Sequence, residues 1–358
     1  MSAFQCITKV LSGAKAMDHL KTIHASCVFL VTDAYFASNG IAEAVAKYFE
    51  GAAVRVFDEV VPDPPAELAA RGAALCENCH PDVLVALGGG SVIDCAKGIR
   101  AAYEYPVMFV AIPTTSGSGS EMTSFSVLTK DGVKYPLVDP SLRPDLTILA
   151  DDFLTKLPPS LIADTGMDLL AHCMEALVGK NRSGFTDALS IYGIRTVLNS
   201  LVASYSGDRS VRMTLHEAAA MAGLAFEHAG LGLCHGLAHS MGSLFHIPHG
   251  RLCAMLLPHV MEFNAENALS QYASLARVCG LSAATDRLAL RSLQSELRRL
   301  RRAMRLPENL GQAGVTRGQW AAYKEGVVEA TLQDPCCQTN PVPVTREAIE
   351  IVLKAVSP

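Results

Sequence analysis

The stretch LVALGGGSVIDCAKGIR, residues 84–100, passes from an apolar run through three glycines into a segment with helical spacing. It predicts a buried strand, a tight turn at Gly88–Gly90 and a helix that Ser91 opens. Glycine has no Cβ, so backbone N–H groups at such a turn can approach a phosphate, and the start of a helix favours an anion. The spacing is not G-x-G-x-x-G, and a simple tight turn is the alternative interpretation.

Apolar runs alternate with Ala-rich segments around this stretch. The runs at 27–32, 53–57, 83–87 and 107–112 predict buried parallel strands, and the segments at 40–50, 66–79 and 91–103 predict helices between them. This βαβ order predicts a doubly wound α/β domain. The residues SFSVLT and VKYPLV, within 124–138, predict a hairpin that turns near Asp131–Gly132.

Beyond about residue 160 the apolar residues recur with helical periodicity, and Pro158 and Pro159 interrupt the chain just before that change. We therefore expect an α/β dinucleotide-binding domain at 1–155 and an all-helical domain at 156–358. At 358 residues, with half of them hydrophobic, the chain can bury the core of two domains.

The net charge of −5 gives no reason to expect nucleic acid or a membrane surface as a partner. The basic run at 287–305 has Leu and Ala at helical spacing, which is typical of one solvated face. The 11 cysteines include no CxxC pair, so we expect reduced thiols in a cytoplasmic protein. No signal peptide or membrane-spanning run is evident, and we expect no membrane segment.

A second Gly-rich loop, IPTTSGSGSEMT at 112–123, follows another predicted strand. Two such loops after neighbouring strands indicate ligand binding at the carboxyl edge of the sheet. Asp33 ends the first strand, where a carboxylate can accept a hydrogen bond from a ribose 2′-hydroxyl and repel a 2′-phosphate. This favours NAD over NADP, and a helix N-cap is the alternative role of Asp33.

The helical half contains residues typical of a metal site. Asp168 and His172 are four apart and share a helix face. Five of the 11 histidines fall within 228–249, and His235 and His249 are among them. One carboxylate with several imidazoles suits Fe²⁺ or Zn²⁺, and helix capping or packing is the alternative for any one of these residues alone. We expect the cluster to occupy one helix and the loop after it.

Four segments together resemble the iron-containing alcohol dehydrogenases: GGGSVIDCAK (88–97), PTTSGSGSE (113–121), TGMDLLAHCMEAL (165–177) and HGLAHSMGSLFHIPHG (235–250). The resemblance runs from Ser12–Gly13 to TNP at 339–341, which is nearly the whole chain. The segments KYPLVDPSLRPDLTILADD (134–152) and LFHIPHG (244–250) are most similar to the 1-propanol dehydrogenase branch that is associated with propanediol use in bacterial microcompartments.

The resemblance implies an active site in a cleft between the two domains. It implies that the metal ligands are Asp168, His172, His235 and His249. His239 corresponds to a histidine near the nicotinamide with a role in proton transfer, and packing beside the metal ligands is the alternative. The residues that correspond to dinucleotide contacts are Asp33, Gly89, Gly90, Ser91, Asp94, Thr114, Thr115 and Lys134. Lys134 is otherwise an exposed strand residue.

Phe226 corresponds to an aromatic residue against the substrate, and Phe125 replaces a more polar residue of some relatives. Either side chain can instead belong to the core, which we favour for Phe125. A pocket lined by both would suit short unbranched aldehydes. In one departure from the family, Val342 and Pro343 follow the TNP segment, where Arg is common.

The expected reaction is reversible hydride transfer between NAD(H) and a short-chain alcohol or aldehyde at Fe²⁺, with Zn²⁺ as the alternative ion. A zinc polyol dehydrogenase, a lactaldehyde reductase, a dehydroquinate-synthase-like lyase and a non-catalytic metal-binding scaffold are the other interpretations. A lyase for phosphorylated acids needs several basic residues, whereas the window 228–251 holds only Arg251. We also expect a homodimer or higher homo-oligomer in the cytoplasm, with association with a microcompartment as a further expectation.

Overall fold

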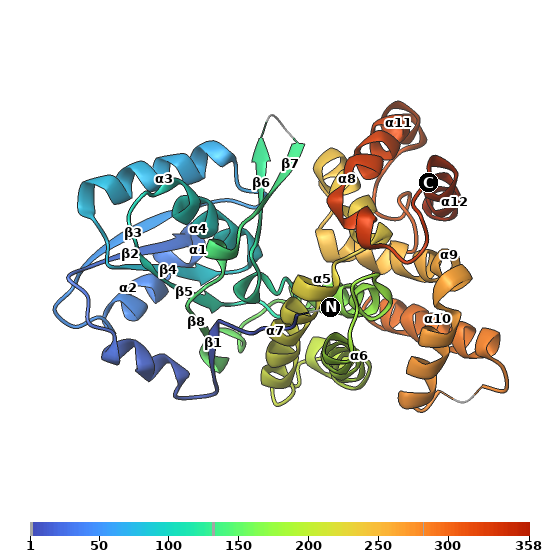
Figure 1. Cartoon of the computed structure of the whole chain (residues 1–358), viewed down its shortest axis with the longest axis horizontal. Helices are drawn as coiled ribbons and strands as arrows, with labels where there is room; N and C mark the ends of the chain where they lie inside the picture. The colour runs from blue at the N-terminus through green and yellow to red at the C-terminus, as the bar shows by residue number, and fades with distance from the viewer. Residues whose placement is uncertain (1–2, 131–132, 282) are drawn as a thin grey trace. The chain divides into compact units, whose positions relative to one another are not determined.

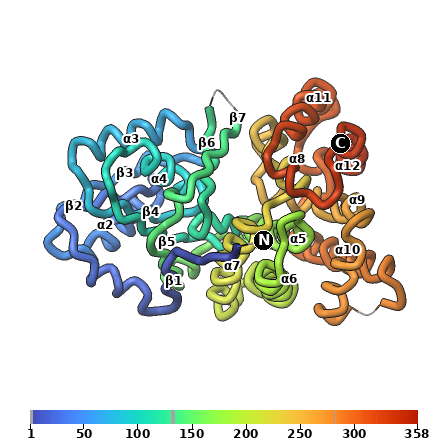
Figure 2. The backbone as a smooth tube through the Cα atoms, viewed as in Figure 1, coloured from blue at the N-terminus to red at the C-terminus, as the bar shows by residue number. Residues whose placement is uncertain are grey.

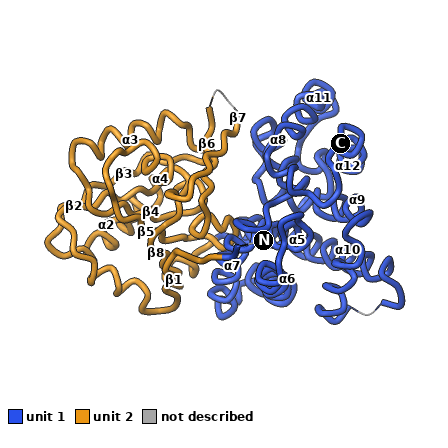
Figure 3. Tube along the Cα trace, in the orientation of Figure 1, with its two compact units in different colours: residues 1–4, 158–358 blue, residues 5–157 orange. Residues whose placement is uncertain are grey.

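The computed structural model describes residues 3–130, 133–281 and 283–358. The chain divides into two compact units, residues 5–157 and residues 158–358 together with residues 3–4 (Figure 3). The division at 157/158 lies close to the boundary that the sequence suggested at 155/156. The turn expected at Asp131–Gly132 lies outside the described residues.

The first unit is built on a parallel sheet of six strands in the order β1-β8-β5-β4-β2-β3 (Figure 1). Its strands are β1 (Lys9–Ser12), β2 (Cys27–Asp33), β3 (Ala53–Val60), β4 (Val83–Gly88), β5 (Met108–Pro113) and β8 (Leu146–Leu149). Four of them match the expected runs, and the doubly wound fold is confirmed. The sequence analysis missed β1 and β8, each only four residues long.

Both faces of the sheet are covered, because side chains alternate along each strand. Residues such as Phe29 and Leu84 pack on one face with α3 (Ala66–Cys79) and α4 (Gly90–Ala102). Residues such as Leu30 and Val85 pack on the other face with η1 (Ala16–Thr22) and α2 (Ile41–Ala46). The helix expected at 40–50 is shorter, since α2 ends at Ala46. A further short helix, α1 (Ala34–Ser38), precedes it, and Gly40 adopts a left-handed conformation between the two.

A small hairpin follows the second Gly-rich loop. The strands β6 (Phe125–Lys130) and β7 (Val133–Val138) pair antiparallel, as predicted. Lys97 of α4 is fully buried and donates to the carbonyl oxygens of Ser120 and Phe125, each at 2.6 Å. The loop and the hairpin are therefore tied to the helix that follows the first Gly-rich turn. Short 3₁₀ turns η2 (Ser120–Met122), η3 (Pro140–Leu142) and η4 (Asp151–Phe153) complete this unit.

The second unit is helical, and the tube in Figure 2 follows its path. It comprises α5 (Pro159–Val178), α6 (Gly184–Tyr205), α7 (Arg212–Ala229), α8 (Leu233–Phe245), α9 (His249–Val278), α10 (Asp286–Ala303), α11 (Arg317–Gln333), η5 (Pro335–Thr339) and α12 (Arg346–Val356). Phe4 belongs to this unit because its ring stacks on Phe185 at 5.0 Å and contacts His228 at 4.6 Å, centroid to centroid. Within the described residues, no helix combines the length and apolar character that crossing a bilayer requires.

Candidate metal centre

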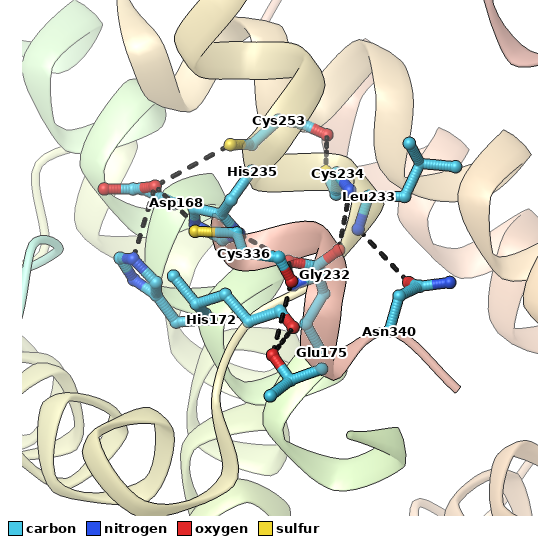
Figure 4. Close-up of polar contacts among 12 residues, drawn as sticks. Asp168, His172, Glu175, Gly232, Leu233, Cys234, His235, Cys253, Cys336 and Asn340 are labelled. Atoms are coloured by element: carbon cyan, nitrogen blue, oxygen red, sulfur yellow. Dashed lines mark hydrogen bonds and ion pairs between the residues drawn. The ribbon is translucent and has the colours of Figure 1, made fainter. Parts of the chain in front are cut away.

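Four side chains converge in the helical unit, and Figure 4 shows three of them, Asp168, His172 and His235. Asp168 and His172 lie one turn apart on α5, His235 lies on α8, and His249 opens α9. The Nε2 atoms of His249, His235 and His172 lie 3.4, 3.6 and 4.0 Å from Asp168 Oδ1. The structure therefore brings together all four residues that the sequence suggested as metal ligands. His249 belongs to a helix and not, as expected, to the loop after α8.

A common cation can span these separations, since each is below the about 4.2 Å between two donors on opposite sides of one ion. Two donors that are each about 2.1 Å from one ion lie about 3.0 Å apart at a right angle and about 3.4 Å apart in a tetrahedron. His235 is 1% exposed, and its Nε2 atom has no hydrogen-bond partner among the described residues. A buried nitrogen of this kind, aimed at a carboxylate, is the atom that a metal ion would bind. The donor types suit Fe²⁺ or Zn²⁺.

The charges of these four side chains also indicate a need for a cation. Burial alone would raise the pKa of Asp168, but the imidazoles of His172, His249 and His235 hold it well below its usual range. Burial alone would lower the pKa of His235, but its contacts with Asp168 and Glu175 raise that pKa to about 10. Positive charge thus stabilises this buried carboxylate, and a divalent ion would supply it in place of the imidazole protons.

Glu175 holds His235 in place. His235 Nδ1 donates to Glu175 Oε2 at 2.6 Å, which leaves Nε2 to face Asp168. The Glu175 carboxylate also accepts from the backbone N–H groups of Gly232 and Cys234, at 2.9 and 2.7 Å. Glu175 lies seven residues after Asp168 and three after His172 on α5. One face of this helix therefore carries two of the donors and also the carboxylate that holds a third donor, His235.

The segment at 339–341 positions the start of α8. Asn340 is fully buried, and its Oδ1 accepts from Leu233 N at 3.1 Å and from Asn264 Nδ2 at 3.1 Å. Thr339 Oγ1 donates to Leu231 O at 2.6 Å. These contacts explain why TNP matters far from the metal ligands in sequence. Val342, which follows this segment, helps to hold Asn340, because the carbonyl oxygen of Val342 accepts from Asn340 Nδ2 at 2.7 Å.

Helix α9 begins in close contact with α5. A Cβ on Gly250 would lie 1.8 Å from Asp164 O, so only glycine allows this approach. Next to it, Arg251 binds both carboxylate oxygens of Asp164, at 3.1 and 2.9 Å. Together, the small residue and the bidentate ion pair bring His249 within reach of Asp168.

His239 lies one turn after His235 on α8, and its ring stacks on that of His249 at 5.2 Å. Its Nδ1 atom bonds Asp334 Oδ2 at 2.9 Å, while Asp334 Oδ1 accepts from Cys336 N at 2.8 Å. Burial alone would raise the pKa of Asp334, but the contact with His239 lowers it. An ionised Asp334 accepts a hydrogen bond from Nδ1–H of His239, which leaves Nε2 of the neutral ring as a proton acceptor.

The two phenylalanines have different surroundings. Phe226 on α7 is 6% exposed, and its ring stacks on His172 at 4.5 Å between centroids. Phe226 therefore borders the donor cluster. Phe125 is partly buried at the start of β6 in the α/β unit, where its carbonyl oxygen accepts from Lys97.

The expected dinucleotide residues gather at one edge of the parallel sheet. Strands β2, β4 and β5 are neighbours, and their carboxyl ends lead to Asp33, to Gly88–Gly90 and to Thr114–Thr115. The connections after β2 and β4 run in opposite directions across the sheet, which is where open α/β folds bind ligands. Gly89 caps α4, and the first N–H groups of that helix, at Gly90 and Ser91, lack acceptors within the helix.

The two Gly-rich loops touch each other. Thr114 N donates to Gly88 O at 3.0 Å, and a Cβ on Gly90 would lie 2.9 Å from Ser118 Cβ. The glycine thus serves packing between the loops as well as access for a ligand. A phosphate that approaches this edge would meet the backbone of both loops.

Three other residues expected at the cofactor have contacts within the protein. Asp33 caps α1, since Oδ1 accepts from Tyr35 N and Phe36 N at 2.9 and 3.1 Å. Asp94 accepts from Ser120 Oγ at 2.5 Å and from Val127 N at 3.2 Å. Lys134 pairs with Asp63 at 2.9 Å, and its side chain is only 17% exposed. It is therefore not a plain exposed strand residue, and its contact with a dinucleotide stays a prediction.

The sequence analysis missed three residues of this region: Glu175, Asp334 and Cys253. A signal existed for Glu175, which shares a helix face with Asp168 and His172. No local pattern could have found Asp334, which is 95 residues from His239. Cys253 lies one turn after His249, and its Sγ is 3.8 Å from Asp168 Oδ1.

Comparisons with known proteins agree along the whole chain. Residues 8–151 match the iron-containing alcohol dehydrogenase family, and residues 162–357 match the C-terminal part of the Fe-containing alcohol dehydrogenase family. The 1-propanol dehydrogenase PduQ of Citrobacter freundii is 35% identical, over 99% of both chains. The NADPH-dependent butanol dehydrogenase of Clostridium saccharobutylicum is 33% identical, over 99% of this chain and 98% of its own.

A solved structure is similar over the same length. The iron-containing alcohol dehydrogenase from Thermococcus thioreducens superimposes with a TM-score of 0.92, at 33% identity, over 99% of both chains. The sequence comparisons and the structural comparison therefore identify the same family.

Glu175→Gln tests the support of His235. The substitution removes the negative charge that holds Nδ1–H, so we expect Zn²⁺ to bind about 10–100-fold more weakly to the metal-free protein. Chelator competition measures the affinity, and Glu266→Gln, at an exposed site on α9, is the control. Equal affinity in wild type and Glu175→Gln would contradict the role of Glu175.

Proposed function

Because the chain belongs to the iron-containing alcohol dehydrogenase family, we propose that it transfers hydride reversibly between NAD(H) and a short-chain primary alcohol or aldehyde, such as propanol and propanal. The observation that carries this proposal is the convergence of the Asp168 carboxylate with three imidazoles in the helical unit. The phosphate-compatible loops of the α/β unit support the cofactor half of it.

We assign Asp168, His172, His235 and His249 as the residues that hold the ion. The family name and the donor types favour Fe²⁺, with Zn²⁺ as the alternative. When bound, such an ion supplies a Lewis acid that polarises the oxygen of the substrate. The protein contributes the fixed geometry, since Glu175 and Asn340 determine where His235 lies.

His239 is the proposed proton carrier. Asp334 holds Nδ1–H, so the Nε2 lone pair can accept the proton of the alcohol or return it to the alkoxide. The His239 side chain is 19% exposed, which allows exchange of that proton with water. Phe226 supplies an apolar surface beside His172, consistent with a short hydrocarbon chain.

For the cofactor, we propose that the pyrophosphate lies against the two Gly-rich loops and that Asp33 binds the adenosine ribose. Both hydrogen bonds of the helix cap go to Asp33 Oδ1, and no described residue donates to Oδ2. One carboxylate can therefore cap α1 and also accept from a 2′-hydroxyl. This supports NAD, although one relative is NADPH-dependent.

The alternative chemistries have less support. A lyase for phosphorylated acids requires free basic groups near the metal, whereas the guanidinium of Arg251 already binds Asp164 through Nε and Nη2. A non-catalytic scaffold has no use for two phosphate-compatible loops. The cytoplasmic location, the homo-oligomeric state, the cleft between the domains and the association with a microcompartment stay predictions.

An anaerobic assay tests the reaction. The protein is loaded with Fe²⁺ or Zn²⁺ and offered acetaldehyde, propanal or butanal with NADH or NADPH. We expect oxidation of NADH with propanal, and loss of turnover with unchanged NADH binding in His249→Ala, because a donor to the ion is gone. His246→Asn, at an exposed position with left-handed backbone, is the control. Turnover in His249→Ala equal to that of wild type would refute the assignment.

Asp334→Asn tests the proton carrier. Without a charged acceptor for Nδ1–H, the orientation and tautomer of His239 are no longer fixed. We expect kcat for propanal reduction to fall at least about tenfold, with NADH affinity and metal content unchanged. Steady-state kinetics measure this, and Asp286→Asn on the surface of α10 is the control. An unchanged kcat would exclude a role for Asp334 in proton transfer.

Asp33→Asn tests cofactor choice. Asparagine keeps the helix cap but removes the charge that would repel a 2′-phosphate. We expect the ratio of kcat/KM for NADPH over NADH to rise about tenfold, since a charge contact at such a site is worth on the order of 1.4 kcal/mol. Asp139→Asn, which caps the 3₁₀ turn η3, is a matched control. A constant ratio in Asp33→Asn would leave Asp33 as a helix cap only.

A further inference from the structure

A thiol lies among the metal donors. Cys253 is one turn after His249 on α9 and is fully buried. Its Sγ atom lies 3.8 Å from Asp168 Oδ1 (Figure 4). The same atom lies 3.7 Å from His249 Nε2. Donor atoms of Asp168, His235, His249 and Cys253 all lie within 4.8 Å of one another. The thiol is therefore part of the donor group itself.

The distances are those of ligands to one ion. A sulfur about 2.3 Å from an ion and an oxygen or nitrogen about 2.1 Å from it lie about 3.8 Å apart at an angle of about 120°, an angle that a centre with five ligands provides. The two measured separations of Cys253 Sγ, 3.8 and 3.7 Å, are close to that value. His235 Nε2 adds an independent observation, since it is buried, without a hydrogen bond among the described residues, and aimed at the same point.

We propose that the Cys253 sulfur is a further protein ligand of the metal, beside Asp168 and the three histidines. The proposal rests on the proposed function only in requiring that this centre binds a divalent ion. On binding, the S–H bond breaks, the proton leaves to water, and the sulfur electron pair forms the bond to the metal. No redox change is involved.

The charge and the softness of a thiolate ligand affect which metal ion the site binds. A divalent cation with the Asp168 carboxylate and one thiolate forms a neutral buried unit, whereas the carboxylate alone leaves one positive charge. A thiolate also favours Zn²⁺ or Fe²⁺ over harder ions such as Mn²⁺, which prefer oxygen. Cys253 thus determines which metal the site prefers.

An ordinary buried cysteine nearby behaves differently. Cys173 follows His172 on α5, but its thiol packs against Gly193 of α6, where a Cβ would lie 2.5 Å from Sγ. Burial raises the pKa of Cys173, with no polar partner contributing to the shift. Cys173→Ser is therefore a matched control, in which a buried thiol is lost without loss of a donor.

Cobalt reports the ligand directly. Co²⁺ bound to a thiolate has a sulfur-to-cobalt charge-transfer band in the near ultraviolet. We expect this band in Co²⁺-loaded wild type and Cys173→Ser and its loss in Cys253→Ser. Zn²⁺ affinity relative to Mn²⁺ should fall at least about tenfold in Cys253→Ser, because loss of a direct ligand costs no less than loss of a supporting one.

X-ray absorption of the Zn²⁺-loaded wild type provides a measurement that needs no variant, and we expect one sulfur at about 2.3 Å. A Co²⁺ site without the band, a band that survives Cys253→Ser, or a zinc shell without sulfur overturns the proposal. In each case an active enzyme with NADH and propanal leaves the proposed function intact. A wild type that binds neither Co²⁺ nor Zn²⁺ overturns both.

Discussion

The helical unit is organised around one buried carboxylate that requires positive charge. Asp168 is 8% exposed and faces three imidazoles from α5, α8 and α9. In a low-dielectric interior such a charge is costly unless it is compensated, so the surrounding elements must keep their positions. The approach of α9 at Gly250 and the hold of Glu175 on His235 are both consequences of this requirement.

Support for the site comes from distant parts of the chain. Asn340 and Thr339 fix the loop before α8, and Asp334 bonds the side chain of His239. The proposed metal donors lie within residues 168–249, but the segment at 334–342 bonds the start of α8 and the side chain of His239. The last part of the chain therefore belongs to the site, although it offers no expected metal ligand.

Much of the fold and of the candidate site could be predicted from the sequence, for physical reasons that differ between residues. Asp168 and His172 follow from helical spacing, and the strands at 83–88 and 108–113 follow from continuous apolar runs. The edge strand β1 is mostly exposed and lacks such a run. Asp334 and Cys253 act through contacts between helices, which a linear pattern does not reveal. Asp33 shows the opposite case, in which an observed helix cap and a proposed ligand contact share one sequence signal.

The contact of Phe4 with Phe185 and His228 bears on how the protein is made. The α/β unit is one uninterrupted stretch of chain, whereas the helical unit takes residues from both sides of that stretch. As the polypeptide leaves the ribosome, the sheet can be completed while Phe4 still lacks a surface to dock on. Phe4 must wait for α6 and α7 to emerge, so a residue synthesised before the sheet reaches its native partners after the sheet can form.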